Sequence, residues 1–172
     1  MVDHYLGRVI VIGDARAGKS SLMRRYFNNE FKRDEVSTLG VDFRLKEKTI
    51  DNKYHIKLQI WDTAGQERFN SIIEHFFRDT TCVVLVYDIT NRNSFENVEK
   101  WIERVRNIDE PGMLYLIGNK SDLSQFRDVN IEDGSELAQK INARFFETSA
   151  KSNYDSCVNR MFDAIVADVY NI

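Results

Sequence analysis

The chain has 172 residues and a formal net charge of −3, with 24 Lys and Arg residues against 27 Asp and Glu residues. This length predicts one domain over residues 1–172, large enough to bury a substantial apolar core. Acidic and basic side chains are mixed throughout the chain. The composition therefore gives no indication of nucleic-acid binding or of constitutive binding to anionic lipid.

The sequence also lacks the patterns of secreted and membrane-spanning proteins. Its first four residues do not have the layout of a signal peptide, and no apolar run approaches the roughly 20 residues of a membrane span. Cys82 and Cys157 lie in apolar stretches, which favours buried thiols in a reducing compartment over a disulfide. We therefore expect a soluble, cytoplasmic protein.

Short apolar runs rich in β-branched residues alternate with segments of helical periodicity. This alternation predicts an α/β fold, a doubly wound, mostly parallel six-stranded sheet with one antiparallel edge strand. The second and third strands are too close for a helical crossover, so we expect them to form a hairpin through Asp51 and Asn52. In chain order the expected elements are a strand near 5–12, a helix near 18–28, strands near 41–50 and 53–61, a helix near 69–79, a strand near 82–88, a helix near 93–108, a strand near 113–119, a helix near 132–142, a strand near 144–149 and a helix near 154–170.

The loop after the first expected strand fits the pattern G-x-x-x-x-G-K-[ST]. In this pattern backbone N–H groups surround a phosphate, the lysine supplies a cation and the hydroxyl ligates Mg²⁺. The orphan donors of the next helix add to the same anion site. The alternative is a glycine-rich turn without a ligand. The pattern predicts nucleotide contacts from Asp14, Ala15, Arg16, Ala17, Gly18, Lys19, Ser20 and Ser21.

Three further motifs follow in a fixed order, at residues 62–67, 118–122 and 148–151. Each lies near the carboxyl end of an expected strand, so the loops are expected to converge on one edge of the sheet. With these motifs the chain resembles the Ras superfamily of small GTPases. Residues 39–43, 57–61, 68–72 and 85–90 resemble the Rab branch most, and the resemblance runs from about residue 7 to about residue 168.

The resemblance implies GTP and GDP as ligands together with Mg²⁺. Ser20 and Thr38 would ligate the metal, and Asp62 would hold it through a water. Thr38 would join only when the γ-phosphate is present, and the Gly65 N–H would reach that phosphate. Gln66 would orient the attacking water. The residues expected to act in catalysis are Gln66, Lys19 and Thr38.

Base selection is expected at residues 119–122. A carboxylate with two acceptor oxygens, as in Asp122, matches the N1–H and 2-amino donors of guanine, whereas adenine would present an acceptor instead. A plain turn is the alternative for this motif. Phe31 matches the aromatic residue that lies across the guanine ring in the family, with a staple between loop and core as its alternative. The complete set expected at the base is Phe31, Asn119, Lys120, Asp122, Ser149, Ala150 and Lys151.

The resemblance also implies protein partners: an exchange factor, a GTPase-activating protein and effectors. The residues that match the family's effector-binding rings are Phe43, Trp61 and Phe76, with membership of the core as the alternative. The sequence ends at Ile172 without the cysteine-bearing tail that Rab proteins use for prenylation. Either the tail is missing from this sequence or the protein has no lipid anchor. A prenylated form would lie on the cytoplasmic face of an endomembrane.

Two positions of the phosphate loop depart from the family pattern. Ala15 and Arg16 stand where glycine or another small residue is common. They leave open a second interpretation, a GTP-binding scaffold with little or no hydrolysis. An ATP-using enzyme with the same loop is disfavoured by Asp122 and by the lack of a substrate domain.

Overall fold

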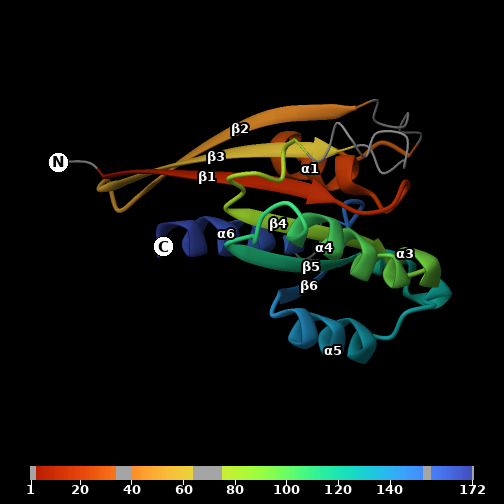
Figure 1. Ribbon diagram of the computed structural model, residues 1–172. Helices are drawn as coiled ribbons and strands as arrows, with labels where there is room; N and C mark the ends of the chain where they lie inside the picture. Colours follow the sequence, from red (N-terminus) through yellow and green to blue (C-terminus); the bar gives the residue numbers. More distant parts are fainter. Residues whose placement is uncertain (1–2, 34–39, 64–74, 153–155, 172) are drawn as a thin grey trace.

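The computed structural model describes residues 3–33, 40–63, 75–152 and 156–171. Six strands form one sheet in the order β2-β3-β1-β4-β5-β6 (Figure 1). The sheet is parallel except for the antiparallel pairing of β2 with β3, which confirms the predicted fold class. The strands are β1 (Asp3–Ile12), β2 (Val41–Ile50), β3 (Tyr54–Thr63), β4 (Cys82–Asp88), β5 (Met113–Asn119) and β6 (Arg144–Thr148). The helices are α1 (Lys19–Asn28), α3 (Arg92–Glu96), α4 (Val98–Arg106), α5 (Ile131–Ile141) and α6 (Cys157–Tyr170), together with the 3-10 helix η2 (Ser121–Phe126).

The sheet separates two apolar cores. Successive side chains of a strand point to opposite faces, so Val9 and Val11 of β1 pack with α1 and α6, whereas Ile10 and Ile12 pack with α3, α4 and α5. All four side chains are at most 1% exposed. Helices therefore cover both faces of β1, and the loop that follows this strand emerges between them.

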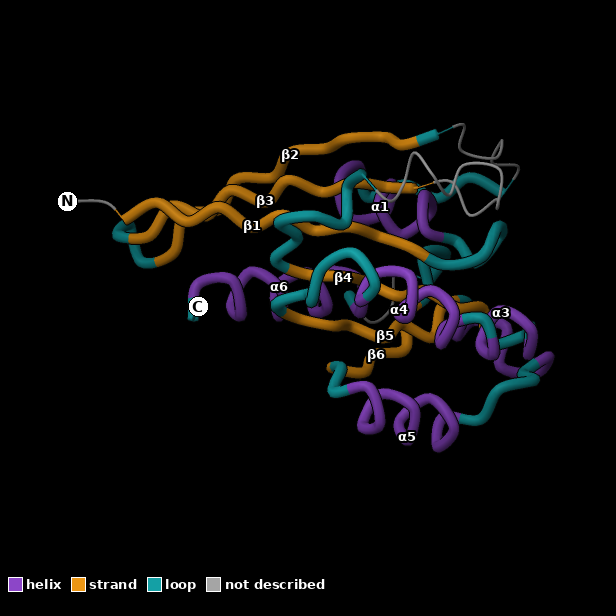
Figure 2. The backbone as a smooth tube through the Cα atoms, in the orientation of Figure 1, coloured by secondary structure: helices purple, strands orange, loops and turns teal. Residues whose placement is uncertain are grey.

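The β2–β3 hairpin closes through residues 51–53, and both Asp51 and Asn52 have a φ of 52°. Asp and Asn tolerate this left-handed conformation better than most residues, which is why the turn forms here. The predicted hairpin is therefore confirmed. Figure 2 shows the turn near the N-terminus, at the opposite end of β1 from the loop that follows this strand.

Two predicted helices differ from the structure. The described end of the helix expected near 69–79 is a set of turns at residues 75–79, where Asp79 has a φ of 57° that no α-helix accommodates. Its residues 69–74 lie outside the described part. The helix expected near 93–108 is divided into α3 and α4 at Asn97, whose side chain reaches Asp14 in the phosphate loop.

Smaller features complete the comparison. The short helix η2 was not predicted, and α6 begins at Cys157 after residues that lie outside the description. Cys82 and Cys157 are buried free thiols. Among the described residues, no helix is long and apolar enough to cross a membrane.

Candidate functional site

Two glycines shape the loop between β1 and α1. A Cβ on Gly13, at a φ of 141°, would lie 2.1 Å from the carbonyl oxygen of Val86. A Cβ on Gly18, at a φ of 93°, would lie 2.3 Å from the side-chain nitrogen of Asn119. Both positions combine a backbone conformation that favours glycine with a close approach to another strand or loop. The loop is thus held against the ends of β4 and β5.

Lys19 begins α1 and folds back over the loop. Its ammonium group donates to the carbonyl oxygens of Gly13 and Asp14, at 2.8 Å each, and the residue is only 5% exposed. Burial lowers the pKa of Lys19 to about 8, and the charges of Asp62 and Asp14 act against that shift. A buried cation at the N-terminus of a helix, where backbone N–H groups are unpaired, is a site for an anion.

Asp62 stands near the end of β3, beside this cation. It is 2% exposed, and within the described residues its Oδ1 has no hydrogen-bond partner. Burial raises the pKa of Asp62 to about 6, while a hydrogen bond with the Ser20 side chain and the charge of Lys19 lower it. A buried carboxylate oxygen without a partner, next to a hydroxyl, is the kind of oxygen donor set that Mg²⁺ takes together with waters and phosphates.

Asp14 does not direct its carboxylate into the loop. Its Oδ2 accepts a hydrogen bond from the Asn97 side chain at 2.7 Å, and its Oδ1 accepts one from the Trp101 indole at 2.8 Å. Both oxygens are therefore occupied by groups at the start of α4. Sequence reasoning missed this connection, although a buried indole N–H requires an acceptor and so signals one.

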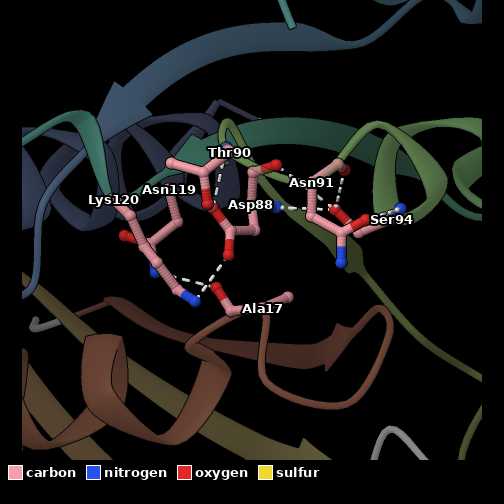
Figure 3. Close-up of polar contacts among 7 residues, drawn as sticks. All are labelled: Ala17, Asp88, Thr90, Asn91, Ser94, Asn119 and Lys120. Carbon is pink, nitrogen blue, oxygen red and sulfur yellow. Dashed lines mark hydrogen bonds and ion pairs between the residues drawn. The ribbon is translucent and has the colours of Figure 1, made fainter. Parts of the chain in front are cut away.

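Asn119, at the end of β5, joins three loops. Its side-chain nitrogen donates to the carbonyl oxygen of Ala17 at 2.9 Å, as Figure 3 shows, and its Oδ1 accepts from the Thr148 hydroxyl at 3.1 Å. The residue is buried. One amide thus fixes the phosphate loop to the ends of β5 and β6.

Lys120 has a left-handed φ of 67° and directs its ammonium group to Asp88 Oδ2, at 2.5 Å. The other oxygen of Asp88 accepts from the N–H and the hydroxyl of Thr90, at 2.9 and 2.7 Å (Figure 3). Asp88 was not among the predicted site residues. The signal was an acidic residue ending a wholly apolar strand, β4, at the edge where the motif loops meet.

The segments at 122 and 149–151 also lie together. The Ser149 hydroxyl donates to Asp122 Oδ1 at 2.6 Å, and the Lys151 ammonium lies 3.9 Å from Asp122 Oδ2. Ser149 Oγ in turn accepts from the N–H groups of Lys151 and Ser152, at 3.2 and 2.9 Å. The structure therefore brings these predicted residues into one cluster.

The remaining predicted residues divide into described and undescribed positions. Ala15 and Arg16 are exposed, Ala17 is buried, Ser21 is half-buried on α1 and Phe31 is exposed. The rings of Phe43 and Trp61 lie 4.5 Å apart, and those of Trp61 and Phe76 lie 4.7 Å apart. The predicted residues that lie outside the described part are Thr38, Gly65 and Gln66.

A sequence model of the family described as "Ras family" matches residues 8–171. The chain belongs to the Ras family. A relative named Ras-related protein Rab-11B, from Dictyostelium discoideum, is 44% identical over 169 residues, which cover 96% of this chain and 76% of that protein. Ras-related protein RabC from the same organism is 42% identical over 173 residues, covering 98% and 86%. Ras-related protein Rab11A from Lotus japonicus is 42% identical over 169 residues, covering 98% and 74%.

These relatives place the Ras-family chain in the Rab branch, as the sequence predicted. Ras-family proteins are GTPases that bind guanine nucleotide with Mg²⁺. The buried Lys19 ammonium and the unpaired oxygen of Asp62 are compatible with a phosphate and a divalent cation at this edge of the sheet.

Proposed function

We propose that this Ras-family chain is a molecular switch that cycles between GTP-bound and GDP-bound states, hydrolyses GTP slowly and controls a vesicle-transport step. Residues 1–172 form its single GTP-binding domain. The observation that carries this proposal is the buried Lys19 ammonium, which donates to two loop carbonyls beside the unpaired carboxylate oxygen of Asp62. A phosphate with its bound Mg²⁺ would stabilise both groups, because the phosphate pairs with the Lys19 ammonium and the metal pairs with the Asp62 carboxylate.

The phosphate groups are held by the backbone of residues 14–18, the start of α1 and Lys19. Ser21 follows on the same helix and completes this set. Ser20 and Thr38 would hold Mg²⁺ directly, and Asp62 would hold it through a water. When bound, the metal neutralises charge on the β- and γ-phosphate oxygens.

Hydrolysis needs little covalent chemistry from the protein. Gln66 positions the attacking water, the Gly65 N–H and Thr38 hold the γ-phosphate, and Lys19 stabilises the charge that develops on the transferred group. Intrinsic rates at sites of this class are on the order of 10⁻⁴ to 10⁻³ s⁻¹, and an arginine from a partner raises them by roughly 10³ to 10⁵. Partners therefore set the time that the switch stays on.

Guanine is selected by Asp122 and by the N–H of Ala150. Ser149 occupies one oxygen of the Asp122 carboxylate and so fixes its orientation. Asn119, Lys120, Lys151 and Phe31 complete the base site. An adenine would leave the half-buried carboxylate facing an acceptor, and such mismatches are strongly penalised.

Partners bind at the face formed by Phe43, Trp61 and Phe76, which in the sequence flank the residues proposed to contact the γ-phosphate. Phe43 is 44% exposed, whereas Trp61 and Phe76 are partly buried against the core. An exchange factor and a GTPase-activating protein act at the same face. If the full-length protein carries a prenylated tail, membrane association takes place on the cytoplasmic face of an endomembrane.

A second candidate function is a GTP-binding scaffold with little hydrolysis. It is favoured by Arg16, whose exposed side chain and φ of 65° put a large cationic residue at the surface of the phosphate loop. One experiment separates the two. The nucleotide that copurifies is identified, and single-turnover GTP cleavage is followed with and without a candidate activating protein. Guanine nucleotide with measurable cleavage supports the switch; guanine nucleotide without cleavage supports the scaffold; absence of guanine nucleotide contradicts both.

A further inference from the structure

Arg25, on α1, reaches a loop that is distant in the sequence. Its Nε donates to the carbonyl oxygen of Ala150 at 2.6 Å, and one of its terminal nitrogens donates to that of Lys151 at 3.3 Å. The other terminal nitrogen donates to the carbonyl and side-chain oxygens of Asn29, at 2.8 and 3.1 Å. A single guanidinium therefore ties the end of α1 to the loop after β6.

These carbonyls need such a donor. Ala150 is 4% exposed and belongs to an irregular segment, so no strand or helix supplies a partner for its carbonyl oxygen. A buried carbonyl left unpaired is costly. The planar fork of arginine can bind two adjacent carbonyls at once, whereas the ammonium group of a lysine is a compact point charge on a flexible stem. The side chain at position 25 thus fixes the path of two consecutive peptide groups.

The same loop leaves one N–H group available. Ser149 N–H donates to Cys157 Sγ at 3.3 Å, while those of Lys151 and Ser152 donate to Ser149 Oγ. Within the described residues, the N–H of Ala150 donates to no acceptor. A nearly buried N–H between occupied neighbours is suited to an acceptor on a ligand.

Helix α1 connects this loop to the phosphate site. Lys19 is its first residue and Arg25 follows six positions later, about 9 Å along the helix axis at 1.5 Å per residue. A helix is stiff over this distance. Arg25 therefore anchors the loop to α1, the same helix that carries the buried Lys19 ammonium.

We propose that Arg25 is a positioning residue for base selection. By holding the carbonyl oxygens of Ala150 and Lys151, it orients the N–H of Ala150 toward the oxygen at position six of guanine. This inference rests on the proposed function, because it assigns the base to the loop at 149–151. Arg25 touches neither base nor phosphate in this role and acts only through the main chain of the loop.

The test compares three nucleotides on the wild type and on Arg25→Ala. GDP and IDP both carry the six-position oxygen, whereas the diphosphate of 2-aminopurine riboside lacks it. Loss of one well-oriented hydrogen bond should weaken GDP and IDP by about tenfold, and the 2-aminopurine nucleotide by less than about twofold. Dissociation constants are measured by competition against a fluorescent GDP analogue, with thermal unfolding recorded in parallel.

An equal loss for all three nucleotides would show that Arg25 only supports the fold, and would overturn the proposal. If the wild type binds GDP no better than ADP, the proposed function itself fails. This outcome concerns the wild type alone and is therefore distinct from an equal loss for the three nucleotides in the variant. Arg25→Lys keeps the charge but not the planar guanidinium, so it should weaken GDP and IDP by about threefold and leave the 2-aminopurine nucleotide nearly unchanged. It replaces Arg25→Ala if that variant does not fold. Arg8→Ala is the matched control, because Arg8 pairs with Asp79 on an exposed surface and should leave all three affinities unchanged.

Discussion

At the scale of single residues, the site consists of polar side chains that are fixed by other polar side chains. Asp122 is oriented by Ser149, and Lys120 is held by Asp88, which is itself held by Thr90. These supporting hydrogen bonds determine how precisely each functional side chain is oriented. Mutations in the supporting groups should therefore alter nucleotide binding without touching the ligand.

Asp122→Asn should weaken GTP by at least about 100-fold and improve binding of xanthosine triphosphate, whose 2-oxo group accepts where guanine donates. Equilibrium competition between the two nucleotides measures the change. Asp128→Asn is the control, because Asp128 accepts a hydrogen bond from the Arg92 main chain away from the site. If Asp122→Asn binds GTP as the wild type does, Asp122 does not read the base.

Asp88→Asn should speed GDP release by about three- to tenfold, because Lys120 loses a charged partner at 2.5 Å and its side chain samples more conformations. The effect should vanish in a Lys120→Met background. Stopped-flow release of a fluorescent GDP analogue is measured for the wild type, the two single variants and the double variant. Equal effects of Asp88→Asn in both backgrounds would mean that Asp88 supports the site by another route.

At the scale of elements, the helix boundary at Asn97 has a clear role. Asn97 keeps helical dihedrals, with φ −73° and ψ −11°, so the chain continues in nearly the same direction from α3 into α4. The start of α4 then presents Asn97 and Trp101 to the Asp14 carboxylate. This contact fixes the phosphate loop from the side opposite α1.

Trp101→Phe keeps most of the buried ring but removes the indole donor to Asp14. A carboxylate left with one donor instead of two should lower the free energy of unfolding by about 1–2 kcal/mol and weaken GDP several-fold. Denaturant unfolding without nucleotide and a GDP titration measure the two effects. In an Asp14→Ala background the substitution should have a much smaller effect. If Trp101→Phe caused the full loss of stability in the Asp14→Ala background as well, the loss would come from packing of the ring and not from the hydrogen bond.

The mostly parallel sheet and the antiparallel pairing of its second and third strands could be predicted from the sequence because periodicity and connection length are local properties. Asp51 and Asn52 marked the hairpin turn in the same way. The contacts of Asp14 with Asn97 and Trp101 could not be predicted, since the partners lie 83 and 87 residues apart. The Trp101 ring packs in the core, while the acceptor for its N–H is supplied only by the folded chain. The helix expected near 69–79 was wrong at 75–79, because periodicity does not register the positive φ of Asp79.

For the whole molecule, the aromatic face of Phe43, Trp61 and Phe76 is the surface that we propose for partner binding. Phe43 is the most accessible of its three rings and lies on the edge strand β2. Trp61 and Phe76 extend from it into the core around α3 and α4. Trp61 and Phe76 therefore pack against the core, whereas the exposed Phe43 ring is available for a test of the partner-surface proposal.

Phe43→Ala should weaken a GTP-selective partner by about tenfold or more, because exposed aromatic residues often dominate interfaces. It should change the free energy of unfolding by less than about 1 kcal/mol, because the ring is partly exposed. Affinity is measured with each nucleotide, beside thermal unfolding. Leu45→Ala is the matched control, since Leu45 lies on the same strand and is 41% exposed. A large loss of stability with partner affinity intact would assign Phe43 to the core.

The position of β2 has a consequence for self-association. It is the outermost strand of the sheet, and a free edge can pair with another chain and seed aggregates. Its basic side chains at 44, 46 and 48 turn inward, where Arg44 and Lys46 lie over the Phe27 ring and Lys48 pairs with Asp163. A second copy paired along this edge would bring its own basic side chains close to those at 44, 46 and 48, and the like charges would repel. The strand therefore disfavours growth by edge-to-edge addition.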